Sequence, residues 1–224
     1  MLQRDYLMKM VEMLVTVLTK VTVHRENKNY GEALKEIESA AKTIAGLDIE
    51  MVKILKADDL IKLMKTSDIF AGRCLISAEL LFEYGKILEE KGSPGYYDIY
   101  NKSFRLYTEA LLTREIPDPG KYYPNTESAI KKLSEAGFFD DDKSENIMTL
   151  FEYYNASGKY SKAEDLLFNI IESGEIDKTV FKKRAVGFYK DMLELDDGQL
   201  SSGNFSKEEA EEGLKEILDM IRSN

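Results

Sequence analysis

IMTLFEYYNASGKYSKA, residues 147–163, contains two runs of helical period that meet at a glycine. Apolar residues in both runs recur every three or four positions, which predicts two amphipathic helices. Gly158 suits the turn between them because glycine adopts left-handed backbone conformations without a steric penalty. Ala163 is small, so the two helix axes can approach each other closely at this point. The stretch therefore predicts an antiparallel helical hairpin over residues 144–173.

The same order of residues recurs elsewhere in the chain and resembles the tetratricopeptide repeat. Tyr30 and Ala33 repeat the spacing of Tyr160 and Ala163, and a looser copy has its small residue at Ser103. The resemblance implies stacked helical hairpins. However, the three small residues lie roughly twice as far apart as the ~34-residue period of tandem repeats. Extra helices must therefore lie between the hairpins.

No segment shows the sustained period-2 alternation of a half-buried strand, so the whole chain is predicted to be helical. The expected architecture is all-α, with antiparallel helical hairpins in an irregular, tetratricopeptide-like α-solenoid and no sheet. We expect a single domain over residues 1–224. Its parts are an N-terminal hairpin (1–46), a middle hairpin (68–114), the best repeat unit (144–173) and C-terminal capping helices (177–224).

Proline and glycine mark the expected breaks between helices. Three prolines predict a loop from Glu115 to Pro124, after which a helix is expected to begin at Asn125 or Thr126. The residues Asp196-Asp197-Gly198 predict a turn.

The first helix is predicted from Leu2 to Glu26, and its apolar stripe is wider than one neighbouring helix can cover. Either several helices of the same chain cover it, or a symmetric contact between subunits does. Leu2, Tyr6 and Met13 lie on the outer edge of the stripe and are expected to remain uncovered. The chain is therefore expected to be a monomer or a homodimer.

The charge and hydropathy of the chain exclude several classes of partner. The formal net charge is −10, which repels nucleic-acid backbones and anionic membranes. A membrane-spanning helix needs about 20 mostly apolar residues, and the charged residues of the first helix interrupt its apolar run. We expect an acidic, cytoplasmic protein that binds neither nucleic acid nor membranes.

The chain contains no recognisable catalytic or cofactor-binding pattern. Cys74 is the only cysteine and His24 the only histidine, whereas a structural zinc site needs about four ligands. Paired carboxylates such as Glu79 and Glu83 occur at helical spacing, and a solvated helix face explains them in a chain with 41 acidic residues. We therefore expect no catalytic residue, no cofactor, no metal site and no enzymatic activity.

Both ends of the chain carry a second resemblance. The opening MLQRDYLMKM, residues 1–10, and the closing NFSKEEAEEGL, residues 204–214, resemble a family of uncharacterised proteins from Gram-positive bacteria. Members of that family have tetratricopeptide-like cores and are classed as a domain of unknown function. The resemblance implies a bacterial helical-repeat protein and supplies no activity.

Helical repeats of this type bind partners along the first helix of each hairpin. By repeat phase, the inward surface would contain seven side chains: Phe82, Lys86, Glu89, Glu145, Met148, Glu152 and Asn155. This lining is acidic with two apolar anchors, which favours a basic or amphipathic peptide, although ordinary surface residues would produce the same pattern. The leading hypothesis is a non-enzymatic protein- or peptide-binding module. The alternative is a homo-oligomeric structural protein that associates through its apolar first helix.

Overall fold

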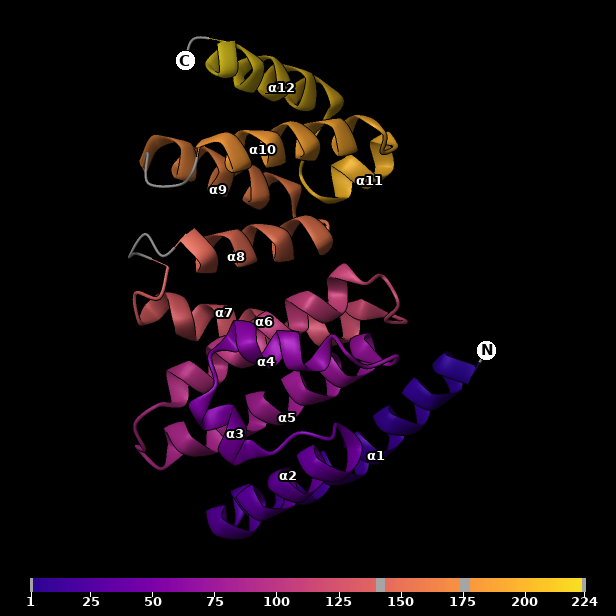
Figure 1. Ribbon diagram of the computed structural model, residues 1–224, viewed down its shortest axis with the longest axis vertical. Helices are drawn as coiled ribbons and strands as arrows, with labels where there is room; N and C mark the ends of the chain where they lie inside the picture. Colours follow the sequence, from indigo (N-terminus) through magenta and orange to yellow (C-terminus); the bar gives the residue numbers. More distant parts are fainter. Residues whose placement is uncertain (1, 140–143, 174–177, 223–224) are drawn as a thin grey trace. The chain divides into compact units, whose positions relative to one another are not determined.

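The computed structural model describes residues 2–139, 144–173 and 178–222, in which it contains α-helices, one 3-10 helix and no β-strand (Figure 1). The all-α prediction is therefore confirmed for these residues. The chain divides into two compact units, Met1–Phe138 and Phe139–Asn224, and the single domain over residues 1–224 stays a prediction. We refer to them as unit 1 and unit 2 and describe each by itself.

Unit 1 is built on a long central helix, α5. Its helices are α1 (Leu2–Glu26), α2 (Tyr30–Ile44), α3 (Ile49–Ile54), α4 (Ala57–Met64), α5 (Phe70–Glu90), α6 (Tyr96–Leu112), the 3-10 helix η1 (Pro119–Tyr122) and α7 (Tyr123–Glu135). Helix α5 packs against α1, α2, α4, α6 and α7. It is consequently buried around most of its circumference, and apolar side chains point from it in every direction.

Small residues allow the helices α5 and α6 to approach closely. A Cβ atom on Gly85 would lie 2.8 Å from the ring of Tyr100. Ser103 is fully buried, and its hydroxyl donates a 2.7 Å hydrogen bond to the carbonyl oxygen of Ala78. The small residue predicted for the second helix of the middle hairpin thus lies at the helix contact.

Two basic side chains cap the ends of neighbouring helices in unit 1. The Arg73 Nε atom donates a 2.8 Å hydrogen bond to the carbonyl oxygen of Ala45, at the C-terminus of α2. The buried Lys102 ammonium group donates to the carbonyl oxygen of Val52 over 2.8 Å, near the C-terminus of α3. Both contacts place a cation against the negative end of a helix dipole.

Unit 2 contains the helical hairpin predicted over residues 144–173. Its helices are α8 (Ser144–Ala156), α9 (Tyr160–Ser173), α10 (Lys178–Leu193), α11 (Asp197–Ser202) and α12 (Lys207–Arg222). Gly158 has a φ of 75° in the α8–α9 turn, and Ala163 is fully buried. The ring centroids of Phe151 and Phe188 lie 5.6 Å apart in the core of this unit.

The buried position of Ala163 leads to a stability prediction. Ala163→Leu is expected to lower the free energy of unfolding by about 1–3 kcal/mol, because the added carbons overpack a closed core. Urea denaturation measures the change, and Asp165→Leu is the matched control at a neighbouring exposed position. Equal stability of Ala163→Leu and the wild type would contradict the close helix contact.

Two of the predicted breaks are wrong. Helix α7 begins at Tyr123 and includes Pro124 in its first turn, where the missing amide hydrogen costs nothing. Asp196 does not form a simple turn but caps α11: its carboxylate accepts a hydrogen bond from the Gln199 amide, and the Gln199 side chain bonds back to the Asp196 amide.

The negative charge of the chain is unevenly distributed between the two units. Residues 139–224 contain 20 acidic and 11 basic residues, whereas residues 1–138 contain 21 acidic and 20 basic residues. Nine of the ten net negative charges therefore belong to unit 2. None of the helices in the described part of the chain combines the length and apolarity needed to cross a membrane.

Candidate functional site

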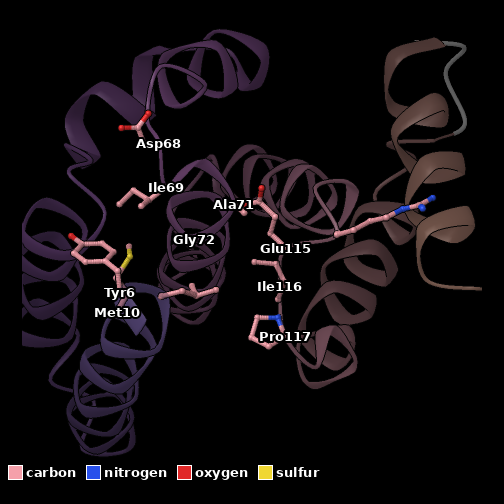
Figure 2. A pocket seen from close by; sticks show the side chains of 11 residues that line it. Tyr6, Met10, Asp68, Ile69, Ala71, Gly72, Glu115, Ile116 and Pro117 are labelled. Atoms are coloured by element: carbon pink, nitrogen blue, oxygen red, sulfur yellow. The ribbon is translucent and has the colours of Figure 1, made fainter. Parts of the chain in front are cut away.

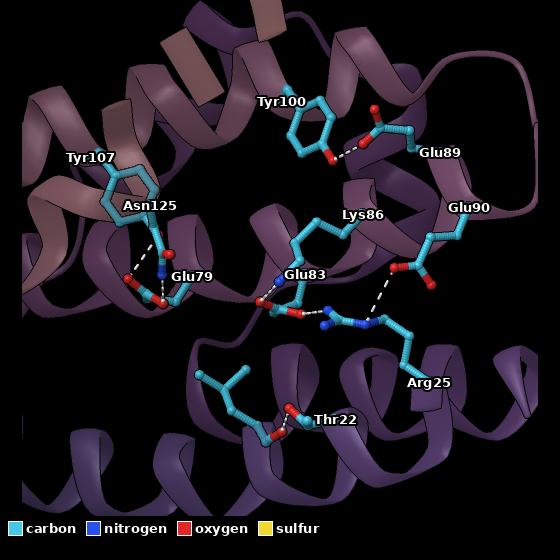
Figure 3. A network of polar contacts seen from close by, with 11 residues as sticks. Thr22, Arg25, Glu79, Glu83, Lys86, Glu89, Glu90, Tyr100, Tyr107 and Asn125 are labelled. Carbon is cyan, nitrogen blue, oxygen red and sulfur yellow. Dashed lines mark hydrogen bonds and ion pairs between the residues drawn. The ribbon is translucent and has the colours of Figure 1, made fainter. Parts of the chain in front are cut away.

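A buried carboxylate joins three helices of unit 1 (Figure 3). Glu79 on α5 is 4% exposed, and its carboxylate accepts a 2.7 Å hydrogen bond from the Tyr107 hydroxyl on α6. Its other oxygen accepts a 2.9 Å hydrogen bond from the Asn125 side-chain amide on α7. Burial raises the pKa of Glu79, which the two hydrogen bonds partly oppose.

A second carboxylate lies one helical turn further along α5. Glu83 accepts a 2.6 Å hydrogen bond from the Arg25 guanidinium on α1 and a 2.7 Å hydrogen bond from the Lys86 ammonium group. Arg25 also contacts Glu90 at 3.4 Å. These contacts attach α1 to α5 and leave the Glu83 side chain only 13% exposed.

A third carboxylate connects α5 to α6 and α7. Glu89 accepts hydrogen bonds of 2.7 Å from the Tyr100 hydroxyl and 2.6 Å from the Lys132 ammonium group. Although burial acts in the opposite direction, these two bonds lower the pKa of Glu89. Burial raises the pKa of Tyr100, and so does its hydrogen bond to Glu89.

The explanation of Glu79 and Glu83 as a solvated helix face is therefore wrong. Both side chains face other helices, because α5 is covered on most sides. A signal was present in the sequence, since these two acids are the only charged residues in a mostly apolar run over residues 74–85. A carboxylate inside such a run requires buried partners. Each of the three carboxylates is bound by side chains of other helices, so their arrangement serves to join helices.

The structure brings three of the predicted partner-binding residues together in unit 1. Phe82, Lys86 and Glu89 line a groove of about 300 Å³ between α5 and α7. The groove also contains Glu90, Asn125, Ser128 and Lys132. Phe82 is 3% exposed and its ring lies 5.7 Å from that of Tyr100, so it forms the wall rather than a protruding anchor. The two lysines balance the two glutamates in this lining.

The other four predicted residues belong to unit 2. The Glu152 carboxylate accepts two hydrogen bonds from the Arg184 guanidinium, and the one donated by Nε is 2.6 Å long. Met148 packs against the core of the unit. Asn155 is half-buried, and the side chain of Glu145 lies outside the described residues. A common face formed by all seven residues stays a prediction.

A larger cavity, which the sequence did not predict, lies beside α1 (Figure 2). It has a volume of about 440 Å³ and three segments line it: residues 6–10 of α1, residues 68–72 at the start of α5, and residues 114–117 after α6. Leu7, Met10, Ala71 and Ile116 are buried and form an apolar floor. Tyr6 is 48% exposed at the edge of the cavity.

The backbone beside the cavity has an uncommon conformation. Arg114 and Asp118 have φ values of 58° and 49°, in the left-handed region that most side chains avoid. Between them, Glu115, Ile116 and Pro117 line the cavity. Arg114 directly follows the C-cap of α6, where a left-handed residue commonly ends a helix, and Asp118 directly precedes η1.

Part of the apolar stripe of α1 remains uncovered, as its width predicted. Tyr6 and Met13 are 48% and 50% exposed, which confirms the expectation for these two residues. The side chain of Leu2 lies outside the described residues. Tyr6 thus extends the apolar floor of the cavity onto the open surface of α1.

The single thiol lies in the core of unit 1. Cys74 is fully buried, and burial raises its pKa to about 12, so the thiolate is scarce at neutral pH. Within the described residues, His, Cys, Asp and Glu side chains form no group of three that could hold a metal ion.

Comparison with known proteins gives one match. The model of a family described as "Family of unknown function (DUF6483)" matches residues 1–222. No curated protein matches the chain. No solved structure matches it either.

Proposed function

Because the chain belongs to DUF6483, a family of unknown function, we propose a function from the geometry of unit 1: a non-enzymatic module that binds a segment of a partner protein. The cavity beside α1 receives an apolar side chain of that segment. The observation that carries the proposal is the continuity between the apolar floor of the cavity and the exposed ring of Tyr6.

The shape and lining of the cavity fit a partner segment better than a reaction. A volume of about 440 Å³ accommodates one or two large side chains. Apolar anchors that fill such pockets contribute most of the affinity in protein interfaces. The resemblance of the hairpins to tetratricopeptide repeats supports the same class of function, because repeats of that type are binding scaffolds. We also propose that the protein is bacterial and acts in the cytoplasm.

The expected partner segment is amphipathic, with basic residues beside its apolar stripe. Asp68 and Glu115 line the cavity and outnumber its one basic lining residue, Arg114, which favours a cationic segment. Glu115, at the edge of the cavity, is exposed and provides a carboxylate near the apolar floor. Apolar contact gives affinity in this arrangement, and charge gives selectivity between partners.

A fluorescein-labelled helical peptide of leucine and lysine, with one apolar face, tests the proposal by fluorescence anisotropy. We expect saturable binding to the wild-type protein, and about tenfold weaker binding to Tyr6→Asp, because a charge replaces an apolar contact worth about 1.4 kcal/mol. Val15→Asp is the matched control: it makes the same change in charge at an exposed residue of α1 that does not line the cavity.

Two further peptides separate binding in the cavity from non-specific attraction. A scrambled peptide of the same composition has the charge but no apolar face, and it should bind weakly. A peptide of leucine and glutamate has the apolar face with the opposite charge. Equal affinity of the scrambled and amphipathic peptides, or equal weakening by Tyr6→Asp and Val15→Asp, would refute the proposed site.

A further inference from the structure

Two glycines inside helices of this chain make room for aromatic rings. A Cβ atom on Gly85 of α5 would lie 2.8 Å from the Tyr100 ring. A Cβ atom on Gly213 of α12 would lie even closer to the Tyr189 ring. At both positions the absence of a side chain lets the ring approach the helix backbone more closely than any other residue would allow. Each of these glycines thus provides a contact surface for one ring.

Gly72 of α5 provides a similar surface on the floor of the cavity beside α1, together with Leu7 and Met10 (Figure 2). A Cβ atom at Gly72 would lie 3.1 Å from Leu7 Cδ1 and 3.6 Å from Met10 Sδ, which are the free ends of flexible side chains. Outside its own stretch of helix, no other atom of the described residues lies within 4 Å of that point, and neither of the two atoms belongs to a ring. The contact surface at Gly72 is therefore open to a ring that enters the cavity.

The lining around Gly72 suits an aromatic side chain better than an aliphatic one. Met10 carries a polarisable thioether, and sulfur atoms of this kind make favourable contacts with aromatic rings. The Tyr6 ring at the edge of the cavity provides an aromatic surface for a second ring. A cavity of about 150 Å³ in a protein core binds benzene. The volume of about 440 Å³ beside α1 therefore holds a ring together with the atoms that link it to a peptide backbone.

We propose that the apolar anchor of the partner segment is an aromatic side chain, whose ring lies against Gly72 and Met10 on the floor of the cavity. This inference rests on the proposed function, because it names the residue type that fills the cavity of the same site. Gly72 determines the specificity, since its lack of a side chain lets a flat ring reach the floor. The basic residues of the segment lie near Asp68 and Glu115, which are exposed at the cavity.

Fluorescence anisotropy with three labelled peptides tests the proposal. One is the helical peptide of leucine and lysine, and in the other two a central leucine is replaced by phenylalanine or by cyclohexylalanine. Cyclohexylalanine has a saturated ring of similar size that is not flat, so it separates the aromatic contact from the burial of apolar surface. The phenylalanine peptide should bind the wild-type protein about threefold more tightly than either of the other two.

Gly72→Ala tests the contact surface itself. The added methyl group keeps a ring away from the floor, so this variant should bind the phenylalanine and leucine peptides with equal affinity. Gly31→Ala in α2 is the matched control, because nothing in the described part of the chain lies within 4 Å of the Cβ position there. It should keep the preference of the wild type for phenylalanine. Circular dichroism checks that both variants are folded.

Equal affinity of the wild type for the phenylalanine and cyclohexylalanine peptides would overturn the proposal, and this comparison needs no variant protein. A preference for phenylalanine that persists in Gly72→Ala would overturn it as well. If the leucine peptide binds and Tyr6→Asp weakens that binding, but phenylalanine gives no gain, the proposed function stands and only the aromatic anchor is refuted. Absence of binding by all three peptides would refute both.

Discussion

Glu79→Ala is expected to lower the free energy of unfolding by about 3 kcal/mol. The substitution leaves the buried Tyr107 hydroxyl without its acceptor, which costs about 1–3 kcal/mol, and it removes the acceptor of the half-buried Asn125 amide. It also opens a cavity where α5, α6 and α7 meet. Urea denaturation of the full chain measures the loss.

Glu79→Gln is the matched variant, because its side chain has the same shape and retains an acceptor oxygen. We expect it to lose much less stability than Glu79→Ala. Equal losses in the two variants would show that shape rather than hydrogen bonding is responsible. A loss below about 1 kcal/mol in Glu79→Ala would contradict the burial of the carboxyl group.

The difference in stability between the wild type and Glu79→Gln should depend on pH. Burial raises the pKa of Glu79 above its usual 4.5, so the folded protein binds the proton more tightly than the unfolded chain does. The stability that the protonated group contributes is fully present below pH 4.5 and is lost as the pH rises through the folded pKa. The advantage of the wild type over Glu79→Gln should therefore shrink as the pH increases across this interval, and it should be constant above it.

Gly213→Ala is expected to have the second largest effect, with a loss of about 3 kcal/mol. A Cβ atom at this position of α12 would lie 2.3 Å from the Tyr189 ring. That ring is fully buried, and its hydroxyl donates a 2.9 Å hydrogen bond to Glu164, so it cannot move aside freely. Overpacking of this kind typically costs about 1–3 kcal/mol, and the short distance places the cost at the upper end.

Gly187→Ala in α10 is the control, and it is expected to change the stability in the opposite direction. No atom lies within 4 Å of the Cβ position at Gly187, and alanine is favoured over glycine inside a helix by about 1 kcal/mol. This variant should therefore be more stable than the wild type. Thermal or urea unfolding of both variants gives the comparison, and a stable Gly213→Ala protein would refute the close contact between α10 and α12.

Local periodicity accounts for the part of the fold that was predicted correctly. The first helix has the expected bounds, Leu2 to Glu26, because one unbroken pattern of apolar residues covers it. Gly158 and Ala163 have the predicted turn and packing roles, since both depend on residues close in sequence. The errors at Pro124 and Asp196 arose because proline and aspartate are favoured both in turns and at the start of helices.

The candidate site depended on contacts that sequence spacing does not encode. Its cavity is lined by residues 6–10, 68–72 and 114–117, which only the packing of α1 against α5 and the path of the chain after α6 bring together. The partners of Glu79 are 28 and 46 residues away in sequence. An apolar helix interrupted by an acid predicts that such partners exist, but it does not identify them.

The burial of Cys74 makes the chain a convenient background for site-directed labelling. A thiol that is fully buried and has a pKa of about 12 reacts slowly with maleimides and iodoacetamide at neutral pH. A cysteine introduced at an exposed position of α1 would then carry nearly all of the label in the folded protein. Alkylation rates measured one position at a time along the helix would distinguish the face that other helices cover from the face that is open to solvent, without removal of the native cysteine.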